Sequence, residues 1–282
     1  MTEPAYPHAE WRLIFDAPNL PGALNMARDE ALLRSIARGD APPTVRFYGW
    51  QPACLSLGAN QPAAEADDFA LRELGYQLVR RPTGGRAILH TDELTYAVVL
   101  PLSDLRMSPD IVASYRTLSA GLLRGLQILG AQPRSDPLTD REVLKTMGPV
   151  CFDVPSHYEI TVNGKKLLGS AQVRKQGVVL QHGALPLHGD IGRICDVLAF
   201  AADSERQVAR ASLYQHACTL ADALGRPPDW HTTAQALAAG LAEALNVTFT
   251  VAGFTPVELA LAEQLLTEKY ANRAWTVERA VA

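Results

Sequence analysis

Segments with a strand pattern and segments with a helix pattern are mixed along this sequence, but they do not alternate regularly. A regular alternation would favour a doubly wound parallel sheet. The irregular order instead predicts an α+β fold with mixed sheets flanked by helices. The length of 282 residues suits one large domain, so we expect residues 1–282 to form a single domain. Its last portion, from about residue 189 to residue 282, is expected to be mainly helical.

Apolar periodicity predicts the individual elements. Apolar residues at helical spacing predict helices over 22–40 and 109–130. Apolar runs bounded by turn residues predict strands over 43–50, 53–58, 76–81, 94–101, 157–162 and 177–187. Asn163-Gly164 is a strong signal for a two-residue hairpin turn. Beyond residue 189, helical patterns occur over 193–202, 211–225, 233–245 and 256–271.

Composition excludes several classes of protein. Hydrophobic residues make up 48% and charged residues 20% of the chain, as in a globular protein with a real core. The formal net charge is −4, so the total charge does not point to nucleic acid binding. No apolar run approaches the roughly 18 residues of a membrane helix, and no signal peptide is visible at the start. We therefore expect a cytoplasmic protein that binds neither nucleic acid nor membrane.

The four cysteines are widely spaced and form no Cys-x-x-Cys pair, so neither a zinc site nor a disulfide framework is expected. Cys54, Cys195 and Cys218 lie in apolar helix or strand patterns, which is typical of small buried hydrophobic residues. Cys151 differs, because prolines on both sides place it on a predicted loop. Nearby lysines would favour its thiolate. Cys151 is either a reactive thiol or one more buried cysteine.

Two glycine-containing segments are candidates for ligand binding. In "RRPTGGRAILH" (Arg80 to His90), paired glycines after a strand allow the backbone to approach a ligand closely. The alternative is a turn with a solvated basic rim. The segment is neither a P-loop nor a dinucleotide-binding fingerprint.

In "NGKKLLGSAQ" (Asn163 to Gln172), strand alternation sends Lys165 and Lys166 to opposite faces. One lysine therefore points inward, unless both lie on a solvated edge strand. Small residues follow at Gly169, Ser170 and Ala171.

Three histidines, His90, His157 and His182, are candidate bases. Nothing in the sequence pairs any of them with a fixed carboxylate, so no catalytic triad is assigned.

Taken together, these stretches resemble the lipoate–protein ligase and octanoyltransferase family. The resemblance covers nearly the full length in the expected order, and it implies a biotin/lipoate-protein-ligase-like α+β fold. The matching segments are "NMARDEALL" (25–33), "VRFYGWQPACLSLG" (45–58), "RRPTGGRAILHTDELTYAVV" (80–99), "CFDVPSHYEITVNGKKLLGSAQVR" (151–174) and "LQHGALPL" (180–187).

Two positions are similar to the cysteine-dependent octanoyltransferases of this family rather than to its ATP-dependent ligases. The ligases usually carry a third small residue after the paired glycines, where this chain has Arg86, and they lack a cysteine at the position of Cys151. The resemblance implies transfer of octanoyl from acyl carrier protein to a lysine of a lipoyl domain, typically the glycine cleavage H protein. Such a transfer needs neither a cofactor nor a metal.

The resemblance also implies roles for individual residues. Cys151 matches the position of the nucleophile, and Lys166 matches the acyl-site lysine. The expected substrate-binding residues are Arg80, Arg81, Thr83, Gly84, Gly85, Arg86, His90, Gly169, Ser170 and Ala171. We expect the walls of an acyl tunnel to come from the Arg80–His90 segment and from strand residues near Tyr96.

Three other functions remain open: an ATP-dependent lipoate ligase, an amidotransferase that moves octanoyl between lipoyl domains, and a non-catalytic binder of acyl or lipoyl domains. Acidic partner domains are expected to be steered by a local basic cluster. The members of that cluster are Arg80, Arg81, Arg86, Lys165, Lys166, Arg174 and Lys175.

Overall fold

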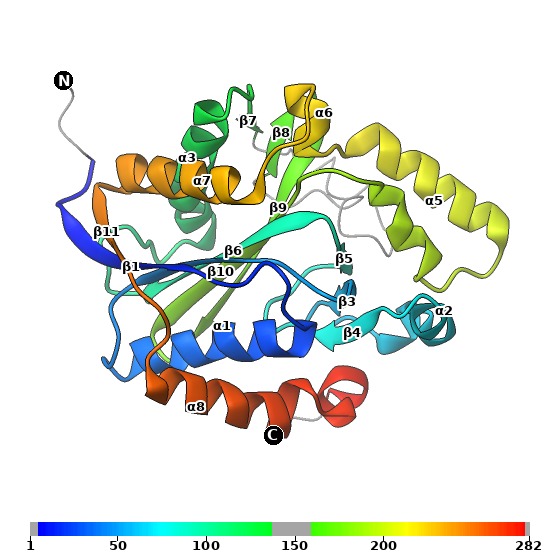
Figure 1. Cartoon of the computed structure of the whole chain (residues 1–282), viewed down its shortest axis with the longest axis horizontal. Helices are drawn as coiled ribbons and strands as arrows, with labels where there is room; N and C mark the ends of the chain where they lie inside the picture. Colours follow the sequence, from blue (N-terminus) through cyan, green and yellow to red (C-terminus); the bar gives the residue numbers. More distant parts are fainter. Residues whose placement is uncertain (1–4, 137–158, 280–282) are drawn as a thin grey trace.

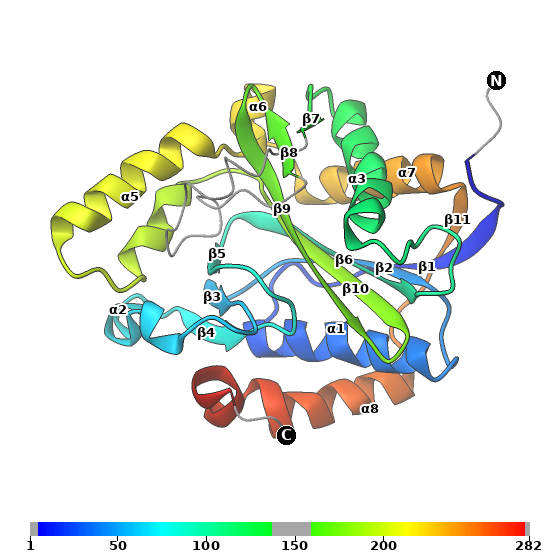
Figure 2. The same ribbon diagram turned by 180° about the vertical axis from the view of Figure 1, so that it is seen from behind.

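A computed structural model describes residues 5–136 and 159–279 of the chain (Figures 1 and 2). Its largest element is a mixed sheet of eight strands in the order β11-β1-β2-β6-β10-β9-β8-β7. β1 runs parallel to β11 and β2, and the other neighbouring pairs are antiparallel. The strands are β1 (Ala9–Phe15), β2 (Thr44–Tyr48), β6 (Glu93–Pro101), β7 (Arg134–Asp136), β8 (Glu159–Val162), β9 (Lys165–Lys175), β10 (Val178–Pro186) and β11 (Val247–Val251).

A smaller sheet has the order β4-β3-β5 and lies beside one end of the large sheet (Figure 1). Its strands are β3 (Cys54–Leu57), β4 (Gln77–Arg80) and β5 (Ile88–His90). A separate hydrophobic cluster joins this sheet to its covering elements. These elements are η1 (Ala63–Glu65), α2 (Asp68–Glu73), η2 (Ile191–Asp196) and α5 (Asp203–His216).

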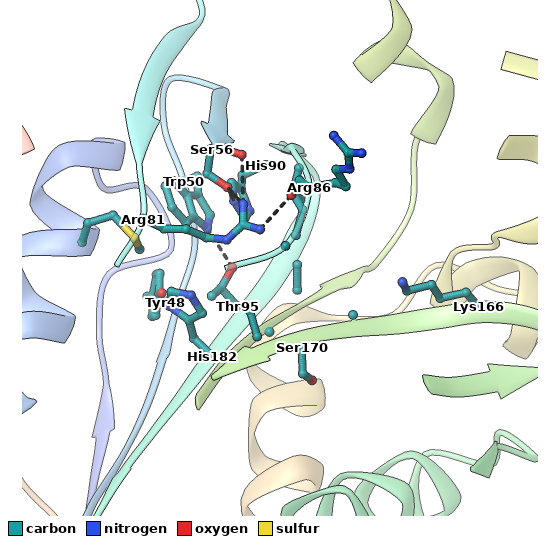
Figure 3. Close-up of a pocket in the computed structure, with 17 residues that line it drawn as sticks. Tyr48, Trp50, Ser56, Arg81, Arg86, His90, Thr95, Lys166, Ser170 and His182 are labelled. Carbon is teal, nitrogen blue, oxygen red and sulfur yellow. Dashed lines mark hydrogen bonds between the residues drawn. The ribbon is translucent and has the colours of Figure 1, made fainter. Parts of the chain in front are cut away.

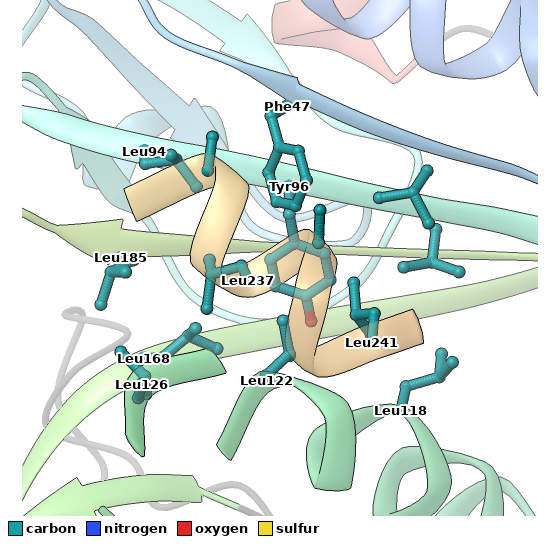
Figure 4. Close-up of a cluster of buried hydrophobic side chains, with 14 of the residues drawn as sticks. Phe47, Leu94, Tyr96, Leu118, Leu122, Leu126, Leu168, Leu185, Leu237 and Leu241 are labelled. Carbon is teal, nitrogen blue, oxygen red and sulfur yellow. The ribbon is translucent and has the colours of Figure 1, made fainter. Parts of the chain in front are cut away.

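Helices α3 (Ile111–Ile128) and α7 (Trp230–Leu245) cover one face of the large sheet. They cross at glycines, because a Cβ on Gly240 would lie 2.2 Å from the backbone nitrogen of Gly125. Both helices pack on a cluster of buried side chains from the sheet (Figure 4). The short helix α6 (Leu220–Leu224) precedes α7.

The opposite face carries α1 (Gly22–Ala37), and α8 (Pro256–Leu265) packs on the outer side of α1. A capping box formed by Thr255 and Glu258 starts α8. After α8 come two short π-helical turns, η3 (Leu266–Tyr270) and η4 (Ala274–Glu278), which extend toward the small sheet. The C-terminal portion of the chain therefore supports the N-terminal helix and the small sheet together.

The α+β fold predicted from the sequence is confirmed. The predicted helices over 22–40 and 109–130 correspond to α1 and α3, and the six predicted strands occur with their ends shifted by a few residues. The hairpin turn is also confirmed, because Asn163 and Gly164 adopt left-handed backbone angles with φ of 53° and 76°.

Other predictions for the elements were wrong. Strands β1 and β11 were not predicted, and they pair with each other although they lie near opposite ends of the sequence. The predicted helix over 211–225 is interrupted at Ala217, which is extended and forms a bridge with Lys166. The predicted helix over 193–202 is replaced by a short 3-10 helix over Ile191–Asp196. After this helix, Leu198 forms a bridge with Ala66. Tertiary pairing overrides local helical propensity at both places.

None of the helices in the described ranges is both long and apolar enough to cross a membrane.

Candidate active site

A cavity of about 210 Å³ lies between the large and small sheets (Figure 3). Its floor comes from β6, β9, β10 and the end of β2, and its remaining walls come from α1, the small sheet and the glycine segment that links β4 to β5. It is lined mainly by apolar atoms, from Met26, Tyr48, Trp50, Ser56, Arg81, Gly85, Arg86, Ile88, His90, Thr95, Lys166, Gly169, Ser170, Ala171, His182, Gly183 and Ala184.

Strand register defines the floor of this cavity. Gly169 of β9 lies opposite Ala184 of β10, Ala184 opposite Thr95 of β6, and Thr95 opposite Tyr48 of β2. Directly opposed residues point to the same face of a sheet, so these four form one row. The row begins with the smallest residues and ends at a tyrosine ring.

Lys166 is buried at the β9 side of the cavity, with 4% of its side chain exposed. Its ammonium lies 2.5 Å from a carboxylate oxygen of Glu159. A Cβ on Gly169 would lie 3.4 Å from the Cε atom of Lys166, so the lysine side chain extends over this glycine. The side chain of Lys165 leaves on the other face and donates to the carbonyl of Tyr214 at 2.6 Å. The predicted inward and outward orientations of the two lysines are confirmed.

Arg81 organises the glycine segment from inside. Its guanidinium donates to the carbonyl and hydroxyl of Ser56 and to the carbonyl oxygens of Gly84 and Arg86. Gly85 has φ of +94°. A Cβ on Gly58 would lie 1.9 Å from the carbonyl oxygen of Gly85, so close packing against β3 requires a glycine at position 58.

Three of the predicted site residues, Arg80, Thr83 and Gly84, do not line the cavity. Arg80 points to the opposite side, where its guanidinium donates to carbonyl oxygens of Gly58, Gln61 and Thr276. The indole of Trp275 in turn donates to the carbonyl of Arg80 at 2.9 Å. This reciprocal pair fixes the end of β4 to the C-terminal turn. The other expected substrate-binding residues do line the cavity: Arg81, Gly85, Arg86, His90, Gly169, Ser170 and Ala171.

His90 lies within a polar network at one wall of the cavity. Its Nδ1 atom is 2.7 Å from Glu93 and its Nε2 atom 2.8 Å from the hydroxyl of Ser56. The indole of Trp50 stacks on the imidazole with a centroid distance of 3.8 Å, and its Nε1 atom donates to Thr95 at 2.7 Å. These contacts fix the position of every polar ring atom in this wall.

His182 occupies the floor, next to the row of small residues. Its Nδ1 atom lies 3.1 Å from Asp29 of α1, and its Nε2 atom lies 2.6 Å from the hydroxyl of Thr83. Burial lowers the pKa of His182, and the hydrogen bond to Asp29 opposes that shift only in part. The imidazole is therefore neutral at physiological pH, a state in which Nδ1 donates to Asp29 and Nε2 accepts from Thr83.

No histidine could be paired with a fixed carboxylate from the sequence alone, but the structure contains two such pairs. His90 pairs with Glu93 and His182 pairs with Asp29, and each carries a hydroxyl on its other nitrogen. Asp29 and His182 are brought together only by the packing of α1 on β10, which no local pattern indicates. The third candidate, His157, lies outside the described residues.

Cys151, the predicted nucleophile, also lies outside the described residues. The other three cysteines are buried, as predicted, with exposed fractions of 0% for Cys54 and Cys195 and 7% for Cys218. Burial raises the pKa of the Cys54 thiol, and it raises that of Cys218 to about 11. Neither Cys54 nor Cys218 is therefore a thiolate at neutral pH.

The basic cluster expected to steer acidic partners does not form one surface. Arg80, Arg81 and Lys166 are buried. Arg174 lies at the far end of β9 from Lys166, where it donates to the carbonyl of Pro109 and the hydroxyl of Ser114. In the ranges 5–136 and 159–279, no group of three or more His, Cys, Asp or Glu residues is arranged to hold a metal ion.

Proteins named as octanoyltransferases match nearly the whole length of this chain. The family model described as the lipoyl protein ligase A/B catalytic domain matches residues 21–242. The chain is 42% identical to an octanoyltransferase LipM of Kyrpidia tusciae, covering 95% of this chain and 99% of that protein. It is 40% identical to an octanoyltransferase LipM of Brevibacillus brevis, covering 96% and 99%.

A solved structure shares the fold. In the archaeal lipoylation system of Thermoplasma acidophilum, a bipartite lipoate protein ligase and its E2 lipoyl domain, the matching chain has a TM-score of 0.81 and 26% identity. The match covers 98% of this chain and 99% of that one. From these matches over nearly its full length, the chain belongs to the lipoyl protein ligase A/B catalytic domain family, and it is an acyltransferase.

Proposed function

We propose that this enzyme transfers an octanoyl group from acyl carrier protein to a lysine of a lipoyl domain, through a thioester on Cys151. The observation that carries the proposal is the buried ammonium of Lys166 at one end of a cavity that is lined mainly by apolar atoms. An apolar cavity suits a hydrocarbon chain, and the ammonium suits the carbonyl group at the reacting end of that chain. The names of the two octanoyltransferase relatives support the same reaction.

The proposed reaction has two acyl transfers. The thiolate of Cys151 attacks the carbonyl carbon of the donor thioester and forms a tetrahedral oxyanion. Collapse of this oxyanion breaks the bond to the carrier sulfur, so the carrier leaves as its thiolate and Cys151 carries the octanoyl group. The ε-amine of the acceptor lysine then attacks this acyl-enzyme. The tetrahedral oxyanion collapses, the bond to Cys151 breaks and an amide forms, and the proton lost from the amine nitrogen passes to the released thiolate or to solvent. Both steps pass through a tetrahedral oxyanion, which the ammonium of Lys166 stabilises.

The dimensions of the cavity support an acyl chain of medium length. Neighbouring strands lie about 4.8 Å apart, so the row from Gly169 through Ala184 to Thr95 provides roughly 10 Å of floor without a large side chain. The floor then meets the buried ring of Tyr48. A chain of eight carbons fits this span, with its carbonyl end beside Lys166.

An ATP-dependent ligase is the main alternative within this family, and the arginines of the glycine segment argue against it. A ligase must hold the phosphate of an acyl adenylate, a task for which arginine is well suited. The guanidinium groups of Arg80 and Arg81 donate to backbone carbonyl oxygens, and Arg86 lies 3.4 Å from Glu65. Arginines engaged in this way are poorly placed to bind a phosphate.

The partners follow from the reaction. The Thermoplasma acidophilum structure pairs a lipoate protein ligase of this fold with its E2 lipoyl domain, which supports a lipoyl domain as the acceptor here. We propose the glycine cleavage H protein as that acceptor and octanoyl-acyl carrier protein as the donor. A thioester donor is already activated, so the transfer needs no nucleotide.

The test is the intact mass of enzyme and acceptor under two conditions. With octanoyl-acyl carrier protein and no ATP, we expect an octanoyl adduct on the enzyme, removable by hydroxylamine, and octanoyl-lysine on an added H protein. Cys151→Ala should abolish both, whereas Cys54→Ala should retain them. Product formed only from free octanoate with ATP and magnesium would identify a ligase. Transfer only from an octanoylated lipoyl domain would identify an amidotransferase.

A further inference from the structure

The end of the cavity remote from Lys166 is closed by three buried side chains from different elements. Tyr48 is 0%, Met26 1% and Trp50 6% exposed, and all three belong to the hydrophobic cluster under α1. In Figure 3, Tyr48 and Trp50 lie on the opposite side of the cavity from Lys166. A chain bound with its carbonyl beside Lys166 therefore points its methyl end at this wall.

Two members of this end wall are held rigidly. The hydroxyl of Tyr48 donates to Asp29 at 2.8 Å, and the guanidinium of Arg46 lies 3.8 Å from the centre of its ring. Trp50 is held by its hydrogen bond to Thr95 and by its stacking on His90. Turning either ring to admit a longer chain would break a buried hydrogen bond, which is costly.

Met26 is the adaptable member of the wall. Its side chain is unbranched and packs with Tyr48 and Trp50 without a polar group to anchor it. Shortening it would deepen the cavity beneath α1 while the two aromatic rings stay in place. A substitution at Ala184 would have the opposite effect and shorten the cavity, because Ala184 lies midway along the floor between Gly169 and Thr95. A larger side chain there would block the cavity before its end.

We propose that Met26 and Ala184 set the length of the acyl chain that the enzyme accepts, and that Tyr48 and Trp50 form the rigid end wall of the cavity. This inference rests on the proposed function, since it assumes that the carbonyl end lies beside Lys166. It adds the residues that select the substrate by length. Each buried methylene group of the acyl chain changes the dissociation constant about fourfold. Two methylene groups that the cavity no longer buries therefore change it by roughly 10-fold or more.

The test measures binding and transfer separately. Saturated fatty acids of six, eight, ten and twelve carbons are titrated by calorimetry into the unmodified protein, Met26→Ala and Ala184→Val. Transfer from the corresponding acyl-carrier-protein thioesters is then assayed with the same proteins. Met107→Ala is the matched control, because Met107 is also buried, at 8%, but lies in the other core. Thermal denaturation checks that every variant is folded.

We expect eight carbons to be preferred by the unmodified protein and by Met107→Ala. In Met26→Ala, the affinity for the ten-carbon acid relative to the eight-carbon acid should rise by about 10-fold. In Ala184→Val, the affinity for the six-carbon acid relative to the eight-carbon acid should also rise by about 10-fold. Failure of every acid to bind, or identical length profiles in folded variants, would overturn the proposal. Shifted binding profiles without any transfer would support the length selection and contradict the proposed function.

Discussion

The ammonium of Lys166 and the carboxylate of Glu159 are 2.5 Å apart, and less than a tenth of either side chain is exposed. The two residues lie on opposite sides of the Asn163-Gly164 turn, on β9 and β8. Breaking a buried ion pair by removing one partner typically costs about 3–5 kcal/mol, because the remaining charge stays buried. The hairpin therefore holds the proposed catalytic ammonium in place at the same time as it forms the edge of the cavity.

The two adjacent lysines should differ sharply in their contribution to catalysis. Lys166→Met keeps much of the packing volume but removes the charge beside the reacting carbonyl, so kcat/KM for octanoyl transfer should fall by about 100-fold or more. Lys165→Met removes only a hydrogen bond to the carbonyl of Tyr214 and should change kcat/KM by less than about threefold. Both are measured with an H protein acceptor, alongside urea unfolding to separate stability from rate. Equal losses in the two variants would contradict the role given to Lys166.

Glu30 should contribute strongly to stability. Burial alone would raise the pKa of this carboxyl, but hydrogen bonds from Lys269, Tyr270 and Arg34 outweigh it and lower the pKa to about 2. A shift from 4.5 to about 2 corresponds to about 3 kcal/mol of stability. That stability is fully present above pH 4.5 and is lost as the pH falls through 4.5 toward 2.

Glu30→Gln should therefore lower the free energy of unfolding by about 3 kcal/mol at pH 7, and the difference should shrink toward pH 3. Urea unfolding at several pH values measures it. Glu10→Gln is the control, because Glu10 is exposed on β1, and it should stay within about 0.5 kcal/mol of the unmodified protein. A difference that does not depend on pH would show that lost packing, and not the ionised carboxylate, is responsible.

The stability of the fold should also depend on pH through His182. Burial lowers the pKa of His182 in the folded protein. Electrostatic repulsion from Arg81 and His90 lowers this pKa further, whereas Asp29 raises it. The unfolded chain takes up this proton near pH 6.5, before the folded protein does. Stability from His182 is therefore complete above pH 6.5 and falls as the pH drops below it.

In His182→Asn, the free energy of unfolding should vary less between pH 7 and pH 5.5 than in the unmodified protein. The exposed residue His8 provides the control, since His8→Asn should leave the pH dependence as it was. An unchanged slope in His182→Asn would mean that His182 takes up its proton equally in the folded and unfolded states.

Two glycines near the cavity should respond differently to an added methyl group. At Gly58 a Cβ would lie 1.9 Å from the carbonyl oxygen of Gly85, so Gly58→Ala must displace the glycine segment and should cost about 1–3 kcal/mol or more. At Gly84 a Cβ would meet nothing within 4 Å, and Gly84→Ala should change stability by less than about 0.5 kcal/mol. Thermal unfolding of the two variants compares them. Comparable destabilisation would show that the segment is not packed as described.

Local patterns predicted the parts of the site that depend on neighbouring residues. The alternation of a strand after the Asn163-Gly164 turn was enough to send Lys165 and Lys166 to opposite faces, and the family resemblance indicated that Lys166 is the inward one. The partner of Lys166 could not be predicted in the same way, because a bulge between Ile160 and Thr161 shifts the register of the hairpin. A simple cross-strand count therefore does not lead to Glu159.

Contacts between distant segments account for the rest. The pairing of Asp29 with His182 depends on how α1 packs on β10, and the end wall combines residues from α1 and the segment around β2. Arg80 was expected to contact substrate because it lies in the Arg80–His90 segment that resembles the family. Strand β4 turns its side chain to the opposite face, where backbone carbonyl oxygens from two segments, the turn at 58–61 and the C-terminal turn, accept its hydrogen bonds.

The reciprocal contact between Arg80 and the C-terminal turn also bears on how the protein is made. A chain is synthesised from its N-terminus, and its early parts begin to fold before the later ones exist. β4 and the glycine segment emerge from the ribosome long before Trp275 and Thr276, which hold Arg80 in place. The contacts that hold the end of β4 are thus completed only after Trp275 and Thr276 have been translated, and a nascent chain that stalls before Trp275 lacks these contacts to Arg80.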